Sequence, residues 1–201
     1  GAKITDNYIT NLIAHDDNGG SYGRGMARAI AFDTDQTLKR PILIADNVID
    51  TVAGDEGDAI SVMSKNGSTY YNANVFITGN HIKDFNRRGC KIKFNSAVIS
   101  NNTFYNTWTS SPVNESGASV VQGAVDLDRG SDHIVTGNKF INIEYMAQIK
   151  IVAAGSERID NCVIKDNVFT RIGSQTTSTL IYVSTSTSTD PNSQGVNLTI
   201  K

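Results

Sequence analysis

Apolar and polar residues alternate along much of the chain, and an asparagine interrupts the alternation at six places. In each case an apolar residue lies three positions before the asparagine and another lies two positions after it. The six asparagines are Asn7, Asn47, Asn80, Asn102, Asn138 and Asn167. Successive side chains of a strand point to opposite faces, so the apolar residues flanking each asparagine would point inward. The pattern predicts two short strands joined by a tight bend.

We expect the asparagine to serve the bend in two ways. Asparagine tolerates left-handed backbone angles and can hydrogen-bond within its own turn. If the repeats stack, the side-chain amides can also form a ladder in which each bonds to the next. Helices are a poor alternative, because these segments are short and rich in β-branched residues and asparagine.

A further alternating stretch follows each bend and predicts a third strand. Its expected inward pairs are Ile30/Phe32, Ile60/Val62, Ile92/Phe94, Val125/Leu127, Ile149/Ile151 and Ile181/Val183. A unit of three short strands cannot bury its apolar side alone, whereas stacked units share a continuous core. The sequence therefore predicts an all-β solenoid.

The repeated phrase with its third strand resembles the pectate-lyase-like superfamily over residues 3–186. The resemblance implies a right-handed, single-stranded parallel β-helix of about six coils. We expect residues 1–186 to form this domain and residues 187–201 to form a loop and a final strand. Because the chain opens inside a repeat without a capping segment, we expect a fragment of a longer protein or ends shielded by partner chains.

Composition narrows the class of partner. The formal net charge of −2 gives no broad basic surface for nucleic acid. The apolar runs are far shorter than the ~20 residues of a membrane-spanning helix, so we expect no membrane partner. Cys90 and Cys162 are expected to be buried free thiols.

No metal or cofactor is expected. The three histidines are dispersed and lack metal-ligand spacing, and His133 aligns with interior positions. The acidic run Asp55, Glu56 and Asp58 is expected to be a solvated turn, with a weak Ca²⁺ site as the alternative. Arg87 and Arg88 are expected at an exposed turn.

Two long segments between the bend and the third strand suggest walls around a trough. One brings Tyr22 and Arg24, and the other brings Trp108 and Glu115. Tyrosine and tryptophan are flat amphipathic groups on which sugar rings can stack. The floor would carry the outward residues of the third strands. We therefore expect substrate-binding roles for Lys91, Lys93, Asn95, Trp108, Tyr22 and Arg24.

The sharpest candidate for chemistry is "VDLDRG", because Asp126 and Asp128 lie two apart on one strand. Their side-chain bases would be roughly 7 Å apart on the same face. Glycosidases use a carboxyl pair in this range as acid and base or nucleophile. Asp33 and Glu115 are the substitutes. The alternative is a structural charge ladder, in which Lys93 and Lys150 stack around Asp126 and keep it ionised.

The resemblance suggests a bacteriophage tailspike-like domain that binds and hydrolyses a bacterial surface polysaccharide. Such a domain would be homotrimeric and located in the virion or outside the cell. One alternative is a polysaccharide lyase or epimerase, with Lys91, Lys93 and Arg28 as candidate groups. The other is a non-catalytic structural or glycan-binding spike shaft.

Overall fold

The computed structural model describes residues 1–14, 26–34, 37–54, 56–64, 72–109, 122–153, 159–171, 179–185 and 196–201. Within these ranges the regular structure consists of strands, and no helix is present. Nor do these ranges contain a helix long and apolar enough to cross a membrane.

The strands form three sheets, which we call A, B and C. Sheet A contains β1 (Ala2–Thr5), β4 (Ile42–Ala45), β7 (Asn72–Thr78), β10 (Asn95–Ser100), β13 (Ile134–Thr136), β16 (Ile159–Lys165) and β19 (Val196–Ile200). Sheet B contains β2 (Tyr8–Ile13), β5 (Val48–Ala53), β8 (His81–Phe85), β11 (Thr103–Tyr105), β14 (Lys139–Ile141) and β17 (Val168–Thr170). Sheet C contains β3 (Met26–Thr34), β6 (Glu56–Ser64), β9 (Arg88–Lys93), β12 (Gly123–Asp128), β15 (Ala147–Ala153) and β18 (Ile181–Thr185).

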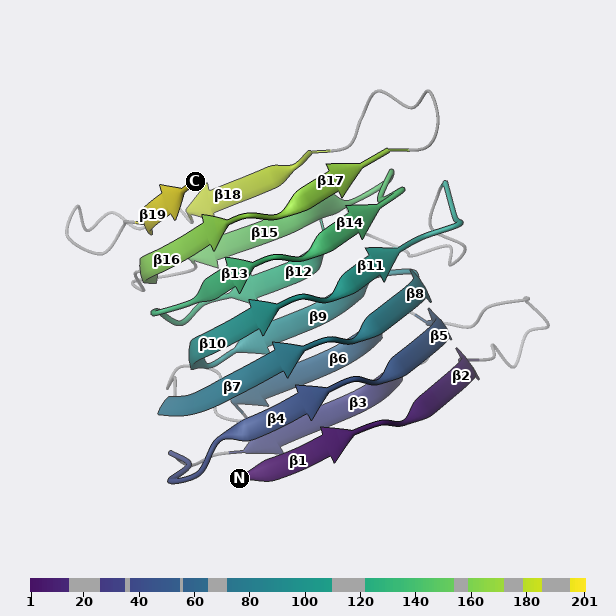
Figure 1. Ribbon diagram of the computed structural model, residues 1–201, viewed down its shortest axis with the longest axis horizontal. Coiled ribbons are helices and arrows are strands. Elements are labelled where there is room, and N and C mark those ends of the chain that lie inside the picture. Colours follow the sequence, from purple (N-terminus) through teal and green to yellow (C-terminus); the bar gives the residue numbers. More distant parts are fainter. Residues whose placement is uncertain are drawn as a thin grey trace.

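The chain visits sheets A, B and C in turn and then returns to sheet A (Figure 1). Neighbouring strands within each sheet pair in parallel. We call one strand from each sheet, taken in sequence, a coil. This arrangement is compatible with a parallel β-helix. The apolar residues preceding the bends are in register from Ile4 through Ile44 and onward to Ile164, as the sequence alignment predicted.

The bends between sheets A and B confirm the predicted amide ladder. The backbone N–H and Nδ2 of Asn47 both donate to Oδ1 of Asn80, at 3.0 and 2.9 Å. Asn80 donates in the same way to Asn102. The same pair of bonds joins Asn7 to Asn47, Asn102 to Asn138 and Asn138 to Asn167. The bends are thus held to one another by side chains as well as by strand pairing.

The expected left-handed backbone lies one residue earlier than predicted. Asp46 has φ 55° and Gly79 has φ 69°, and each immediately precedes a ladder asparagine. The equivalent left-handed residues are Asp6, Asn101, Gly137 and Asp166. The preceding residue turns the chain, which leaves each asparagine to bond along the column.

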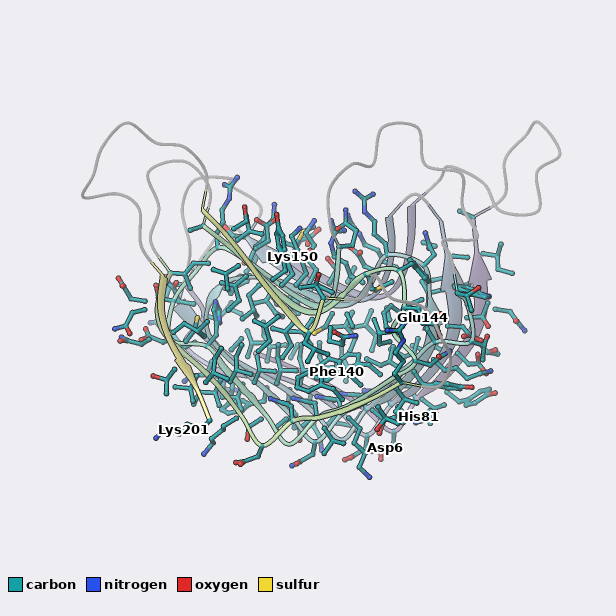
Figure 2. The ribbon with its side chains drawn as sticks, turned by 90° about the horizontal axis from the view of Figure 1, so that it is seen from above. Asp6, His81, Phe140, Glu144, Lys150 and Lys201 are labelled. Atoms are coloured by element: carbon teal, nitrogen blue, oxygen red, sulfur yellow. The ribbon has the colours of Figure 1, made fainter. Side chains whose placement is uncertain are left out.

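The space between the sheets is filled by aliphatic and aromatic side chains. Phe104 and Phe140 stack with ring centroids 5.1 Å apart, and Phe140 and Phe169 stack at 5.2 Å. Figure 2 shows Phe140 between the sheets, whereas Asp6 and His81 lie on the outside. The residues predicted to face inward on β6, β9, β12 and β15 are buried, and so is Phe94, which directly follows β9. Phe32 on β3 is half-buried, and Val183 on β18 is 43% exposed.

Cys90 and Cys162 are buried and free, as predicted. Burial raises the pKa of the Cys90 thiol above its ordinary range and that of Cys162 to about 11. Both thiols therefore remain protonated at neutral pH and behave as small apolar residues.

Candidate functional site: the outer face of sheet C

An extra inward residue near the start of the sheet C strands determines which side chains reach the outer face. Ala59 and Ile60 are consecutive, yet both belong to the buried core. A Cβ on Gly89 would meet the ring of Phe104, so Gly89 also faces inward beside Cys90. This leaves Asp58 and Ser61 outward on β6, and Arg88 and Lys91 outward on β9. Strict alternation would have placed Asp58 and Arg88 inside.

These outward residues build an ion network over sheet C. Arg88 Nη1 donates to Asp58 Oδ1 at 2.9 Å, and Arg88 Nε donates to Asp126 Oδ2 at 2.9 Å. Lys150 Nζ lies 3.4 Å from the same oxygen of Asp126. Arg28 Nε lies 3.8 Å from Asp58 Oδ2. We call Arg28, Asp58, Arg88, Asp126 and Lys150 the sheet C network.

The sheet C network is largely shielded from water. Asp58 is 0% exposed and Asp126 1%, and Arg88 and Lys150 are each 6% exposed. Burial by itself lowers the pKa of Arg88, but the charges and hydrogen bonds of Asp58 and Asp126 outweigh it, so the net pKa is raised. Removing one member would leave its partner as a buried unpaired charge, which makes the network an interdependent unit.

The absence of a side chain at Gly123 leaves space for the Lys150 side chain of the sheet C network. A Cβ on Gly123 would lie 2.7 Å from Cβ of Lys150 and 2.6 Å from the carbonyl oxygen of Val125. A side chain here would therefore collide with the stem of Lys150, which must extend past this point to reach Asp126. The glycine is required by a close approach of neighbouring strands rather than by its backbone angles.

A second, more exposed ion cluster lies one row further along the strands. Lys93 Nζ lies 2.9 Å from Asp128 Oδ2, and Arg129 Nε lies 3.6 Å from Asp128 Oδ1. The Lys93 and Asp128 side chains are 26% and 22% exposed. The prediction that Lys93 stacks beside Asp126 was wrong: Asp126 is in register with Lys91 and Lys150, and Lys93 is paired with Asp128.

The structure places the other predicted site residues at different points. Asp33 is exposed on β3, and Lys91 is 7% exposed beside Asp126 in the sheet register. Asn95 begins β10 in sheet A, where its Oδ1 accepts from the Ser131 N–H at 2.8 Å, so it is not on sheet C. Trp108 is half-buried after β11. Tyr22, Arg24 and Glu115 lie outside the described residues.

Sequence reasoning missed Asp58 and Arg88 as members of the site. Asp58 was expected in a solvated turn and Arg88 at an exposed turn, and both expectations were wrong because both side chains are buried and ion-paired. A usable signal was present. In β6, β9 and β12 a small residue precedes the first inward apolar residue: Ala59, Gly89 and Ala124. A small residue at this position can face inward next to another inward residue. The residues before it are then shifted by one position in the alternation, so that those expected inside point outward.

Three oxygen atoms on this outer face are buried without a hydrogen-bond donor. They are Asp58 Oδ2, Ser61 Oγ and Asp126 Oδ1. Buried acceptors are nearly always satisfied in folded proteins. The described side chains therefore leave these three acceptors beneath the outer face of sheet C without a donor.

No protein-family model matches this chain, and neither the curated proteins nor the solved structures contain a match to it. The described residues also contain no group of three or more histidine, cysteine or acidic side chains that could hold a metal ion.

Proposed function

We propose that the chain is a right-handed parallel β-helix of about six coils, similar to those of pectate-lyase-like proteins, that binds a polysaccharide along the outer face of sheet C. The observation that carries this proposal is that the partly exposed Lys93–Asp128 ion pair lies beside the buried sheet C network on one outer face. A polysaccharide presents many hydroxyl groups, which can donate to carboxylates and accept from lysine. Lys150 lies on this same outer side in Figure 2.

The proposed source of the glycan rests on the resemblance of the repeated sequence to the pectate-lyase-like superfamily. We propose a bacterial surface polysaccharide as the ligand and a bacteriophage tailspike-like homotrimer, in the virion, as the assembly. No cofactor is invoked. We favour binding over hydrolysis as the function. Arg88 and Lys150 hold Asp126 beneath the surface, where a glycosidic oxygen does not reach it.

Hydrolysis is the second candidate, and one observation favours it. Asp126 and Asp128 lie two residues apart on β12 and project from the same outer face. In a glycosidase one carboxylic acid protonates the leaving oxygen and the other carboxylate activates water or attacks the sugar. Asp128 is the accessible member, and substrate would have to displace Lys93 before Asp128 could take up a proton. Asp33 and Glu115 remain substitutes for the second carboxyl group.

A polysaccharide panel tests the proposal. The purified chain would be mixed with bacterial surface polysaccharides, and binding, viscosity, reducing ends and ultraviolet absorbance would be followed together. We expect saturable binding to at least one glycan, weakened about tenfold or more by Lys93→Ala or Asp128→Asn, which corresponds to about 1.4 kcal/mol. Lys139→Ala is the matched control, because Lys139 is an exposed lysine on sheet B.

The outcomes separate the candidates. New reducing ends that Asp128→Asn abolishes even at glycan concentrations that saturate the variant would establish hydrolysis. New absorbance from an unsaturated sugar would indicate a lyase instead. A folded chain that binds none of the glycans, or that loses binding equally with Lys139→Ala, would refute the sheet C site.

A further inference from the structure

A row of apolar side chains crosses the outer face of sheet A. Its members are in register from one strand to the next, and each lies between two buried residues of its own strand or of the residue just before that strand. Phe76 on β7 is 38% exposed, and the other four are half-buried. We call this set the sheet A row, and it consists of Leu43, Phe76, Val98, Ile134 and Val163.

A second row on the same face is small and uncharged. It lies two residues further along the strands, where β4, β7, β10 and β13 carry Ala45, Thr78, Ser100 and Thr136. Ser100 Oγ donates to Thr78 Oγ1 at 3.1 Å, so these two hydroxyls bond each other along the row. From β4 to β13, neither row contains an ionisable side chain. Another surface can therefore approach the sheet A row closely without covering a charge.

The outer faces of the other two sheets are charged. Sheet B carries the Lys83–Asp50 ion pair at 3.2 Å, and sheet C carries the sheet C network and the Lys93–Asp128 pair. Continuous apolar patches on soluble proteins commonly mark interaction sites, and parallel sheets are generally covered on both faces. Of the three outer faces, that of sheet A is therefore the best suited to burial against protein.

Charge and spacing favour a second copy of the chain as the partner of this face. An uncharged face meets an identical face without bringing like charges together, which would oppose association. Neighbouring members of the sheet A row lie about 4.8 Å apart, the distance between strands. A second copy presents side chains at the same interval, so the rows of two copies can interdigitate over several coils.

The face is large enough for association. Sheet A contains seven strands, whose average length is about five residues. With about 4.8 Å between strands and about 3.3 Å per residue, the face covers about 500 Å². Two copies would together bury about 1,000 Å², the size at which specific interfaces begin.

We propose that copies of this chain associate through the outer face of sheet A and bury the sheet A row between them. In a rotationally symmetric assembly, equivalent residues of the copies lie around the axis. Val98 is the middle member of the row and lies nearest to an axis that passes through its centre. A three-fold axis gives the homotrimer of the proposed function, on which this inference rests for the number of copies alone. Figure 1 shows sheet A in front of sheet C, so the outer face of sheet C stays open to glycan.

Two matched valine variants test the surface by light scattering of the full chain over a range of concentrations. Val98 on sheet A and Val48 on sheet B are both half-buried between buried neighbours. Val98→Asp places a charge in the interface, so we expect the dissociation constant of the assembly to rise at least about tenfold. Val48→Asp makes the same change outside the sheet A row and should associate like the unchanged chain. Circular dichroism and urea unfolding check that both variants fold.

An introduced thiol tests the same surface without adding a charge. The chain has two cysteines, and both are buried with raised thiol pKa values, so they do not compete for oxidation. Val98→Cys should form a disulfide between copies under mild oxidation. Val48→Cys should remain uncrosslinked.

Three results would overturn the proposal. They are an unchanged chain that stays monomeric, equal association of the Val98→Asp and Val48→Asp variants, and equal crosslinking of the two cysteine variants. Added salt provides a further check, because it screens charges but does not weaken apolar contacts. Association that salt abolishes would therefore also count against sheet A.

The glycan assay separates this inference from the proposed function. Val98→Asp leaves Lys93 and Asp128 unchanged, so the variant should still bind glycan at the sheet C site. Glycan binding by a chain that does not associate through sheet A would refute the interface and leave the sheet C site standing. Association through sheet A without glycan binding would refute the sheet C site and support the interface.

Discussion

The buried His133 side chain contacts the backbone at two places, on β10 and in the segment after β12. Its exposure is 1%, as its alignment with interior positions suggested. The Ala97 N–H donates to Nδ1 at 3.4 Å, and Nε2 lies 3.3 Å from the Arg129 carbonyl oxygen. Because a carbonyl can only accept, the neutral ring carries its proton on Nε2. A second proton on Nδ1 would face another donor.

His133 predicts a loss of stability in mild acid. Burial lowers its pKa from 6.5 to about 4, against the opposing influence of the Arg129 carbonyl and Asp132. Below pH 6.5 the unfolded chain takes up a proton that the folded chain refuses until about pH 4. The stabilisation is therefore complete above pH 6.5 and falls by about 3 kcal/mol towards pH 4. Urea unfolding across this range measures it.

The variant His133→Gln removes this titrating group. The free energy of unfolding of this variant should therefore change less steeply between pH 4 and 6.5, by the contribution of one proton. His81→Gln is the control, because His81 is exposed at the start of β8. An unchanged pH slope in His133→Gln would show that other groups cause the acid sensitivity.

At the level of elements, the outer face of sheet C combines a buried ion network with a more exposed row. Arg88 connects β6 to β12 by bonding Asp58 and Asp126. Lys93 connects β9 to β12 through the more exposed Asp128. The same chemical interaction thus occurs in two environments, and the energetic consequence of breaking it should differ.

We expect Arg88→Met to destabilise the fold by about 3–5 kcal/mol, because two buried carboxylates lose their shared partner. Lys93→Met should cost no more than about 1 kcal/mol, since water can solvate Asp128. Urea midpoints of the two variants provide the comparison. Similar shifts for both would mean that the sheet C network is more hydrated than its burial indicates.

For the whole molecule, the ladder from Asn7 to Asn167 links successive coils. In the described part of the chain, each middle asparagine is bonded to ladder asparagines on both sides, whereas Asn7 is bonded to one on a single side. A stacked architecture derives its stability from interactions between neighbouring units. The effect of losing a ladder residue should therefore depend on its place in the column.

We expect Asn80→Ala to destabilise by about 2–4 kcal/mol, because it leaves the buried donors of Asn47 without their acceptor. Asn7→Ala should have a clearly smaller effect, because Asn7 is exposed and, among the described residues, donates ladder bonds but accepts none. Thermal unfolding of both variants distinguishes them. Equal losses would show that the ladder contributes only locally at each bend.

Much of the fold followed from the spacing of residues around each asparagine. If the copies stack, the residue three positions before each ladder asparagine and the residue two positions after it must face the same interior. Ile77 and Ile82, which flank Asn80 in this way, are both buried. The ladder followed for the same reason, because identical amides repeat at equivalent positions. The left-handed residue was misplaced by one, since asparagine is compatible with both roles and the sequence alone does not distinguish them.

The site depended on the tertiary structure. The sequence by itself determined that parallel strands would stack and that Asp126 and Asp128 would share an outer face. It did not determine that the additional inward residues Ala59 and Gly89 would turn Asp58 and Arg88 outward, or that Arg88 would reach across to Asp126. Strand pattern is a local property with a period of two residues, whereas ion pairing depends on the register between strands about 30 residues apart in sequence, as for Asp58 and Arg88.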